Sequence, residues 1–121
     1  MTEISEHKHQ VAIFQWAKLC LDLYPQLDLL FAIPNGGQRS RVTGSMLKAE
    51  GVKSGVPDMC LPYPSNGYHG LFIELKKSDG KLSKNQSEWI AKLNAAGYLA
   101  VVAFGAEEAV KIIIDYFEGV N

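Results

Sequence analysis

The sequence predicts an α/β domain in which a mixed β-sheet is flanked by helices. Segments with the apolar spacing of helices alternate with short apolar runs typical of strands, in the order αβαββαβα. Hydrophobic residues make up 47% of the chain and charged residues 21%, which is the balance of a globular protein. The length of 121 residues suits one domain, which we expect to span residues 1–121.

The first half of the chain predicts a helix, a strand and a second helix. Ser5 can cap the first helix, and Tyr24 ends it because the residue before a proline avoids the helical region. The run LLFAI is expected to be a short buried strand, and PNGG directly after it forms a turn. Gly51 suits the C-terminal end of the next helix. These elements are expected over 5–24, 29–33 and 41–50.

The second half predicts three strands and two helices. The strand segments DMCL and GLFIELK are separated by the turn-rich PYPSNG. Ser83 and Gln86 have the spacing of a capping box, and Gly97 ends the helix that they begin. The valine-rich run YLAVVAF is typical of a central strand covered on both faces. These elements are expected over 58–61, 70–76, 83–95, 98–104 and 106–117.

The candidate catalytic residues are Asp58, Glu74 and Lys76. Alternate side chains of a strand share a face, so Glu74 and Lys76 lie together, opposite an apolar face. Asp58 can lie opposite Glu74 if the two strands pair as a hairpin. Two facing carboxylates repel each other unless a cation lies between them, and oxygen ligands suit Mg²⁺ or Mn²⁺. Such an ion activates water for phosphodiester hydrolysis, while Lys76 holds the phosphate, orients the nucleophile or helps to deprotonate it.

Each of these residues also has a plainer interpretation. A Glu and a Lys on one strand face are often a solvated surface pair, although the apolar neighbours of Glu74 and Lys76 favour a site. Glu6 extends the inward stripe of the first helix and could bind a metal, or it could simply favour the helix N-terminus. Gln86 could position water or phosphate, or only complete the cap with Ser83.

Basic residues are concentrated in the middle of the chain. Eight of the twelve lie between Pro34 and Lys84, although the net charge is −1. A local basic surface fits a partner held through phosphates, whereas charge alone would favour an ordinary solvated surface. The expected nucleic-acid contacts are Asn35, Gly36, Gly37, Arg39, Arg41, Lys53, Lys77, Lys81 and Lys84.

The remaining reactive side chains predict no second site. Cys20 and Cys60 lie far apart in apolar contexts and are expected to be reduced core thiols of a cytoplasmic protein. His7, His9 and His69 are expected on the surface. We expect no membrane association and no secretory signal, because the apolar runs are short and the first ten residues are polar.

Four segments of the chain share motifs with a known family. They are IPNGGQR (33–39), LKAEGVKSGVPDMCL (47–61), GLFIELKK (70–77) and GKLSKNQSEWIAKLNAAGY (80–98). Together, in this order and with these gaps, they resemble the VRR-NUC family of virus-type replication-repair nucleases, within the PD-(D/E)xK superfamily. The resemblance covers roughly residues 5–117 and implies a restriction-endonuclease-like core. It also implies a stand-alone member of a kind common in bacteriophages, which would place the protein in the host cytoplasm.

The resemblance also implies roles for individual residues. Asp58 and Glu74 match the family's metal-binding acids, and Lys76 matches its catalytic lysine. The backbone carbonyl of Leu75 is a further metal ligand in this superfamily. Glu6 matches the acid of the first helix that completes many such sites.

Two assignments and the substrate follow from the same resemblance. Glu3 is the alternative to Glu6 as the first-helix acid, and Gln86 matches a polar residue at the edge of the site. Small stand-alone members are thought to act as homodimers on branched DNA, including four-way junctions, and paired nicks need two sites related by a two-fold axis. We therefore expect a metal-dependent endonuclease of DNA replication, recombination or repair. The alternatives are a non-catalytic nucleic-acid-binding module on the same fold and a sequence-specific restriction-type nuclease, for which the chain has little room.

Overall fold

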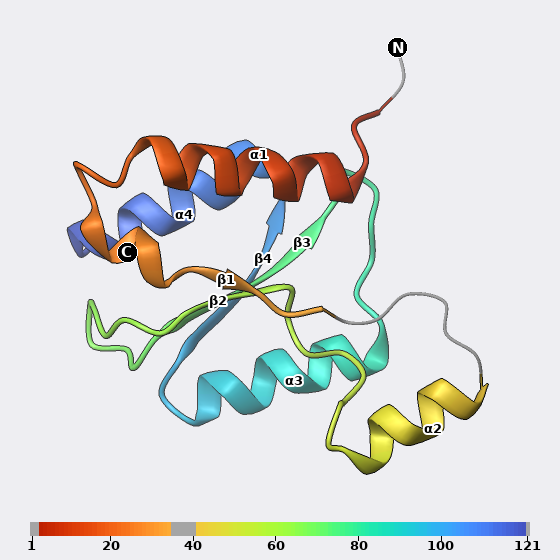
Figure 1. Cartoon of the computed structure of the whole chain (residues 1–121). Helices are drawn as coiled ribbons and strands as arrows, with labels where there is room; N and C mark the ends of the chain where they lie inside the picture. Colours follow the sequence, from red (N-terminus) through yellow and green to blue (C-terminus); the bar gives the residue numbers. More distant parts are fainter. Residues whose placement is uncertain (1–2, 35–40, 121) are drawn as a thin grey trace.

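The computed structural model describes residues 3–34 and 41–120, without the side chains of residues 41–43. It contains a four-stranded sheet with helices on both faces (Figure 1). The elements are α1 (Glu6–Leu19), the 3₁₀ helix η1 (Pro25–Leu29), β1 (Phe31–Ala32), α2 (Arg41–Ala49), β2 (Met59–Leu61), β3 (Leu71–Lys76), α3 (Lys84–Ala95), β4 (Leu99–Phe104) and α4 (Ala106–Glu118). The α/β class, the mixed sheet and the predicted order of helices and strands are confirmed.

The sheet has the strand order β1-β2-β3-β4. β1 and β2, and β2 and β3, pair antiparallel, whereas β3 and β4 pair parallel. Helices α1 and α4 cover one face, and α3 lies across the other (Figure 1). None of the helices in the described ranges is long and apolar enough to cross a membrane.

The main core lies between the sheet and the α1–α4 layer. Leu71, Ile73 and Leu75 of β3 are each 1% exposed and pack in one cluster with Ile13 of α1 and Ile113 of α4. These three β3 residues are the apolar face expected from strand alternation. The residues between them face α3, and this second face carries the polar side chains of the site.

The prediction that 98–104 forms a central strand is wrong. β4 pairs only with β3 and is an edge strand among the strands described. The prediction that both of its faces are covered is right, because α3 packs on one face and α4 on the other. An apolar run indicates that the side chains on both faces of the strand are buried. It does not indicate whether the strand pairs with one neighbouring strand or with two.

The first helix and first strand are shorter than predicted. Helix α1 ends at Leu19, and the amide of Tyr24 then donates to the carbonyl of Cys20 in a turn. The Tyr24 ring stacks on Phe117 of α4, and its hydroxyl donates to Glu118, so contacts with α4 override local helix propensity. Pro25 therefore begins η1, in the first-turn position that proline tolerates, and does not mark the end of α1.

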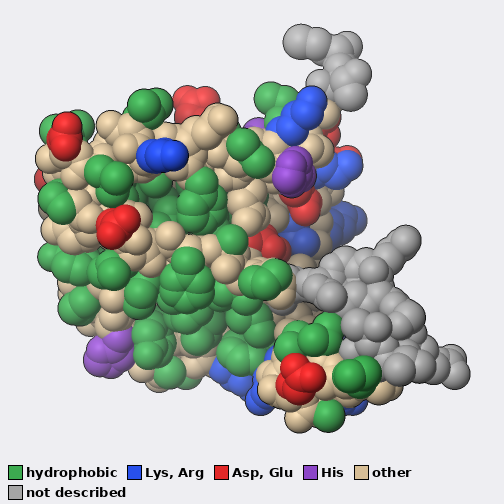
Figure 2. Space-filling view, in the orientation of Figure 1, with side chains coloured by type: hydrophobic (Ala, Val, Ile, Leu, Met, Phe, Trp, Pro, Cys, Tyr) green, Lys and Arg blue, Asp and Glu red, His purple; other side chains and the backbone are tan. Residues whose placement is uncertain are grey.

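The predicted buried strand at 29–33 is also corrected. Only Phe31 and Ala32 pair with β2, and both are exposed. Leu29 belongs to η1 and is 46% exposed, whereas Phe31 is 48% exposed. Figure 2 shows hydrophobic side chains gathered over this part of the molecule, near the sheet edge that β1 forms among the described strands.

Candidate active site

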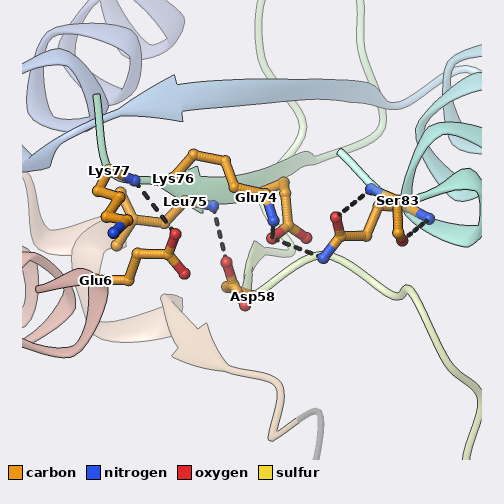
Figure 3. A network of polar contacts seen from close by, with 8 residues as sticks. Glu6, Asp58, Glu74, Leu75, Lys76, Lys77 and Ser83 are labelled. Atoms are coloured by element: carbon orange, nitrogen blue, oxygen red, sulfur yellow. Dashed lines mark hydrogen bonds and ion pairs between the residues drawn. The ribbon is translucent and has the colours of Figure 1, made fainter. Parts of the chain in front are cut away.

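The candidate site lies where β2 and β3 meet the N-terminal ends of α1 and α3 (Figure 3). Glu74 is on the α3 face of β3 and is only 2% exposed. Asp58 immediately precedes β2 and is half-buried. Because Met59 pairs with Ile73 in antiparallel register, Asp58 falls opposite Glu74, as the hairpin hypothesis expected.

Asp58 is held in place by the backbone on two sides. Its Oδ2 atom accepts a hydrogen bond from the amide of Leu75 at 2.8 Å. Its backbone carbonyl accepts one from the amide of Ile33 at 2.7 Å. This anchoring fixes the carboxylate beside β3 without using a basic side chain, so the negative charge remains available within the site.

Glu74 is the most strongly perturbed acid of the site. Burial first, and then the charge and hydrogen bonding of Asp58, raise the pKa of its carboxyl to about 8, against the opposing charge of Lys76. Its Oε1 atom is buried and has no hydrogen-bond partner in the described part of the chain. A buried acid beside a second acid, with one oxygen unsatisfied, is the arrangement that a bound cation would stabilise.

Lys76 lies on the same face as Glu74, two residues further along β3. Its side chain is 12% exposed, and its Nζ atom is 3.8 Å from Oε2 of Glu74. The loop after β3 turns back over the lysine stem at Gly80, where an added Cβ would lie 3.1 Å from Lys76 Cβ. The lysine stem is therefore enclosed by this loop, while the ammonium group lies near Glu74.

Gln86 completes the predicted capping box and also reaches Glu74, while its role toward water or phosphate stays a prediction. Its Oε1 atom accepts a hydrogen bond from the Ser83 amide, while the Ser83 hydroxyl accepts one from the Gln86 amide, so the predicted capping box is present. Its Nε2 atom donates to Oε2 of Glu74 at 3.4 Å. The cap thus fixes the side chain that orients the Glu74 carboxylate.

The loop before Asp58 packs closely on the start of α3. Gly55 has a φ of 91°, and an added Cβ would lie 2.6 Å from the backbone carbon of Asn85. Asn85 Nδ2 also donates to the hydroxyl of Ser54 at 3.3 Å. Only glycine fits this approach, which brings the Asp58 loop and the Gln86 helix to the same site.

The N-terminal part of α1 is fastened to the end of β3 by two acids. Oε2 of Glu6 accepts a hydrogen bond from the Lys77 amide at 3.3 Å (Figure 3). Glu3 accepts bonds from the amide and the hydroxyl of Ser78, and these bonds lower the pKa of its carboxyl. Glu6 is exposed, but its charge still raises the pKa of Glu74, whereas the Glu3 carboxylate is occupied by Ser78.

The acids do not form a complete metal-binding cluster among the described residues. Across the residues described, no three His, Cys, Asp or Glu side chains are grouped to hold a metal ion. Asp58 and Glu74 converge, and Glu6 approaches them from α1 with one oxygen committed to a backbone amide. The metal roles of Glu6 and of the Leu75 carbonyl therefore remain predictions.

His9 makes a contact that sequence reasoning missed. It was expected on the surface, but it is half-buried, and its Nδ1 atom accepts a hydrogen bond from the Ala106 amide at 3.0 Å. The neighbouring Gly105 amide donates to the carbonyl of Lys76. His9 thus joins α1 to the start of α4, directly beside the strand end that carries Lys76.

Removing this acceptor is expected to destabilise the protein. His9→Ala leaves the Ala106 amide without its partner and should lower the free energy of unfolding by about 1–2 kcal/mol. His9→Asn places an amide oxygen near the position of Nδ1 and should recover most of the loss. Urea unfolding of the three proteins measures this, and equal losses in the two variants would contradict the assigned hydrogen bond.

The predicted nucleic-acid contacts are only partly described. Asn35, Gly36, Gly37 and Arg39 lie outside the described residues, and Arg41 begins α2 without a described side chain. The four lysines of the set are all exposed: Lys53, Lys77, Lys81 and Lys84. Lys77 and Lys84 form loose surface ion pairs with Asp79 and Glu88 at 3.8 and 4.0 Å, which an incoming phosphate could replace at little cost.

The mixed sheet with helices on both faces is the predicted α/β domain with a restriction-endonuclease-like core, and one face carries the facing acids and the adjacent lysine. The family profile of the VRR-NUC domain matches residues 1–107, and the chain belongs to the VRR-NUC family. A solved structure described as "VRR_NUC domain protein" is similar, with a TM-score of 0.80 and 28% identity over 98% of this chain and 97% of the other. A search of curated proteins found no match.

Proposed function

We propose that this protein is a metal-dependent endonuclease that hydrolyses phosphodiester bonds in DNA. The observation that carries the proposal is the Glu74 carboxylate, which is buried, faces Asp58 and has one oxygen without a partner among the described residues. A purely structural role would not favour two adjacent acids in this position, because burying their charges is costly. Membership of a nuclease-type family supports the same function.

The donors of the site fit Mg²⁺ or Mn²⁺. The carboxylates of Asp58 and Glu74 would hold the ion, with the Leu75 carbonyl and Glu6 as the further ligands that we propose. When bound, such an ion polarises a phosphoryl oxygen and lowers the pKa of a coordinated water. The positive charge of the ion would also offset the burial and the Asp58 charge that now raise the pKa of Glu74.

Other residues of the site would hold the phosphate and orient the two carboxylates. Lys76 is close enough to Glu74 to neutralise a phosphate oxygen bound at the same place. Gln86 donates to Glu74, and the Leu75 amide donates to Asp58, so both carboxylates are oriented before substrate arrives. The exposed lysines around the site would hold the flanking phosphates.

We further propose that the substrate is branched or junction DNA and that two copies act together. One copy carries one candidate site, and symmetric nicking of two strands needs a pair of sites. The sheet edge at β1, which pairs with no further strand among the described residues, offers an apolar surface for the second copy, with Leu29 and Phe31 nearly half exposed. Sedimentation analysis of the purified protein, with Phe31→Ala for comparison, tests this surface.

A cleavage assay separates the proposal from the non-catalytic module. Labelled linear, flapped and four-way DNA is incubated with the protein in Mg²⁺, Mn²⁺ or chelator. We expect cleavage of the branched substrates with either metal and none in chelator. Tight binding without cleavage under every metal condition would favour a binding module, and cleavage that persists in chelator would exclude the metal-dependent mechanism.

A further inference from the structure

We propose that Phe104 is a stacking platform for an unpaired nucleobase beside the scissile phosphate. The inference rests on the proposed nuclease function and deepens it, because it names the feature of DNA that the site would select. Phe104 is the last residue of β4, and the sequence had predicted it to lie within a buried central strand. In the structure its side chain is 46% exposed.

The pairing of β3 and β4 places Phe104 next to the catalytic lysine. The two strands are parallel, with Glu74 in register with Val102 and Lys76 in register with Phe104. Residues in register on adjacent strands point to the same face, and the strands are about 4.8 Å apart. Phe104 therefore lies beside Lys76 on the face that carries the acids.

The ring is open because α3 stops short of it. Helix α3 begins at Lys84, and its first turn meets the sheet at Glu74 through Gln86. Lys76 and Phe104 lie one pleat beyond this contact, and the chain then leaves the sheet at Gly105. The helix therefore covers Ala100, which is 4% exposed, but leaves Phe104 uncovered.

Phe72, at the opposite end of the same sheet face, has the ring contact that Phe104 lacks in the described part of the chain. There Phe72 of β3 packs edge-on against Tyr98, which in turn contacts His69. Phe104 makes no such ring contact within the described ranges. Phe104, in register with Lys76, is thus left without an aromatic neighbour among the described residues.

Charge and chemistry favour a nucleobase as the occupant. Phe104 is in register with Lys76, and the loop that follows Lys76 carries further exposed lysines, Lys77 and Lys81. An occupant should therefore combine a flat apolar group with phosphates. In a duplex both faces of each base are covered by neighbouring bases, and only an unpaired or frayed base can turn onto an outside ring. Stacking on Phe104 would therefore favour flaps, junction centres and single strands over continuous duplex, with little preference for sequence.

A binding measurement tests this without depending on cleavage. Short single strands carry 2-aminopurine at successive positions, and fluorescence quenching is recorded on titration with protein in Ca²⁺, which occupies oxygen sites. We expect quenching at one or two adjacent positions with the wild type and with Phe104→Trp. Phe104→Ala should lose this quenching and bind the strand about tenfold to hundredfold more weakly, with little change for duplex.

Leu19→Ala is the control, because Leu19 is also an exposed apolar side chain but lies at the end of α1 opposite Glu6. Its binding and quenching should match the wild type. Equal losses for Leu19→Ala and Phe104→Ala, equal weakening on duplex and single strands, or a loss of self-association in Phe104→Ala would each overturn the inference. Circular dichroism of Phe104→Ala should be native, since the ring is already exposed.

The two proposals fail in different ways. Site-specific quenching that depends on Phe104, together with no metal-dependent cleavage by the wild type, would remove the nuclease function and leave the stacking site. Metal-dependent cleavage with unchanged behaviour of Phe104→Ala would remove the stacking site and leave the nuclease.

Discussion

Glu74→Ala is expected to reduce metal-dependent DNA cleavage by about a thousandfold or more. The change removes the buried carboxylate that faces Asp58, so the site loses one of its two converging acidic donors. Loss of a metal ligand withdraws several kcal/mol of transition-state stabilisation, and each 1.4 kcal/mol is about tenfold in rate. Single-turnover cleavage of a branched substrate at saturating protein measures the loss in the chemical step.

Two companion variants show whether the loss is specific. Lys76→Ala should lower the cleavage rate by about a hundredfold or more, while metal binding persists, because the lysine acts on the phosphate. Asp22→Ala removes an exposed acid from the turn after α1, at the end of that helix opposite Glu6, and should cleave normally. Full activity of Glu74→Ala, or an equal loss in Asp22→Ala, would be incompatible with the assigned site.

The second large effect is on stability and depends on pH. The pKa of Glu74 is about 8 in the folded protein, against an ordinary value of 4.5. Between these values the folded state binds more protons than the unfolded state, so this group makes the free energy of unfolding fall as pH rises, levelling off above about pH 8. Glu74→Gln removes the titration and should stabilise the metal-free protein at pH 8 by up to about 5 kcal/mol.

Chemical denaturation at pH 5 and pH 8 in chelator measures this effect. The difference between Glu74→Gln and the wild type should be small at pH 5 and large at pH 8. Adding Mn²⁺ at pH 8 should stabilise the wild type and leave Glu74→Gln nearly unchanged, because a bound cation offsets the buried charge. If Glu74→Gln is less stable than the wild type at pH 8 in chelator, then the charge of Glu74 does not lower the free energy of unfolding.

Local patterns predicted the elements that depend on local physics. The capping box at Ser83 and Gln86 and the alternation along β3 are interactions between residues close in sequence, and both are present. The placement of Asp58 opposite Glu74 could also be predicted from the sequence, because the register of two antiparallel strands joined by a turn-rich loop depends on that loop and on the hydrophobic pattern. These three features suffice to place the acids and Lys76 together.

The features that sequence missed depend on contacts between distant segments. The end of α1 is set by the packing of Tyr24 on Phe117, and the role of His9 is set by an amide that is 97 residues away in sequence. The exposure of Phe104 depends on where α3 stops above the sheet. No periodicity carries such information, since it records only which face of its own element a residue occupies.

The most direct test of the shared-cation site is a crystal of the protein soaked in Mn²⁺. An anomalous difference map should contain a peak about 2 Å from a carboxylate oxygen of both Asp58 and Glu74, with Lys76 beside it. A map in which manganese binds elsewhere, or touches neither of these two carboxylates at saturating concentration, would contradict the proposed mechanism.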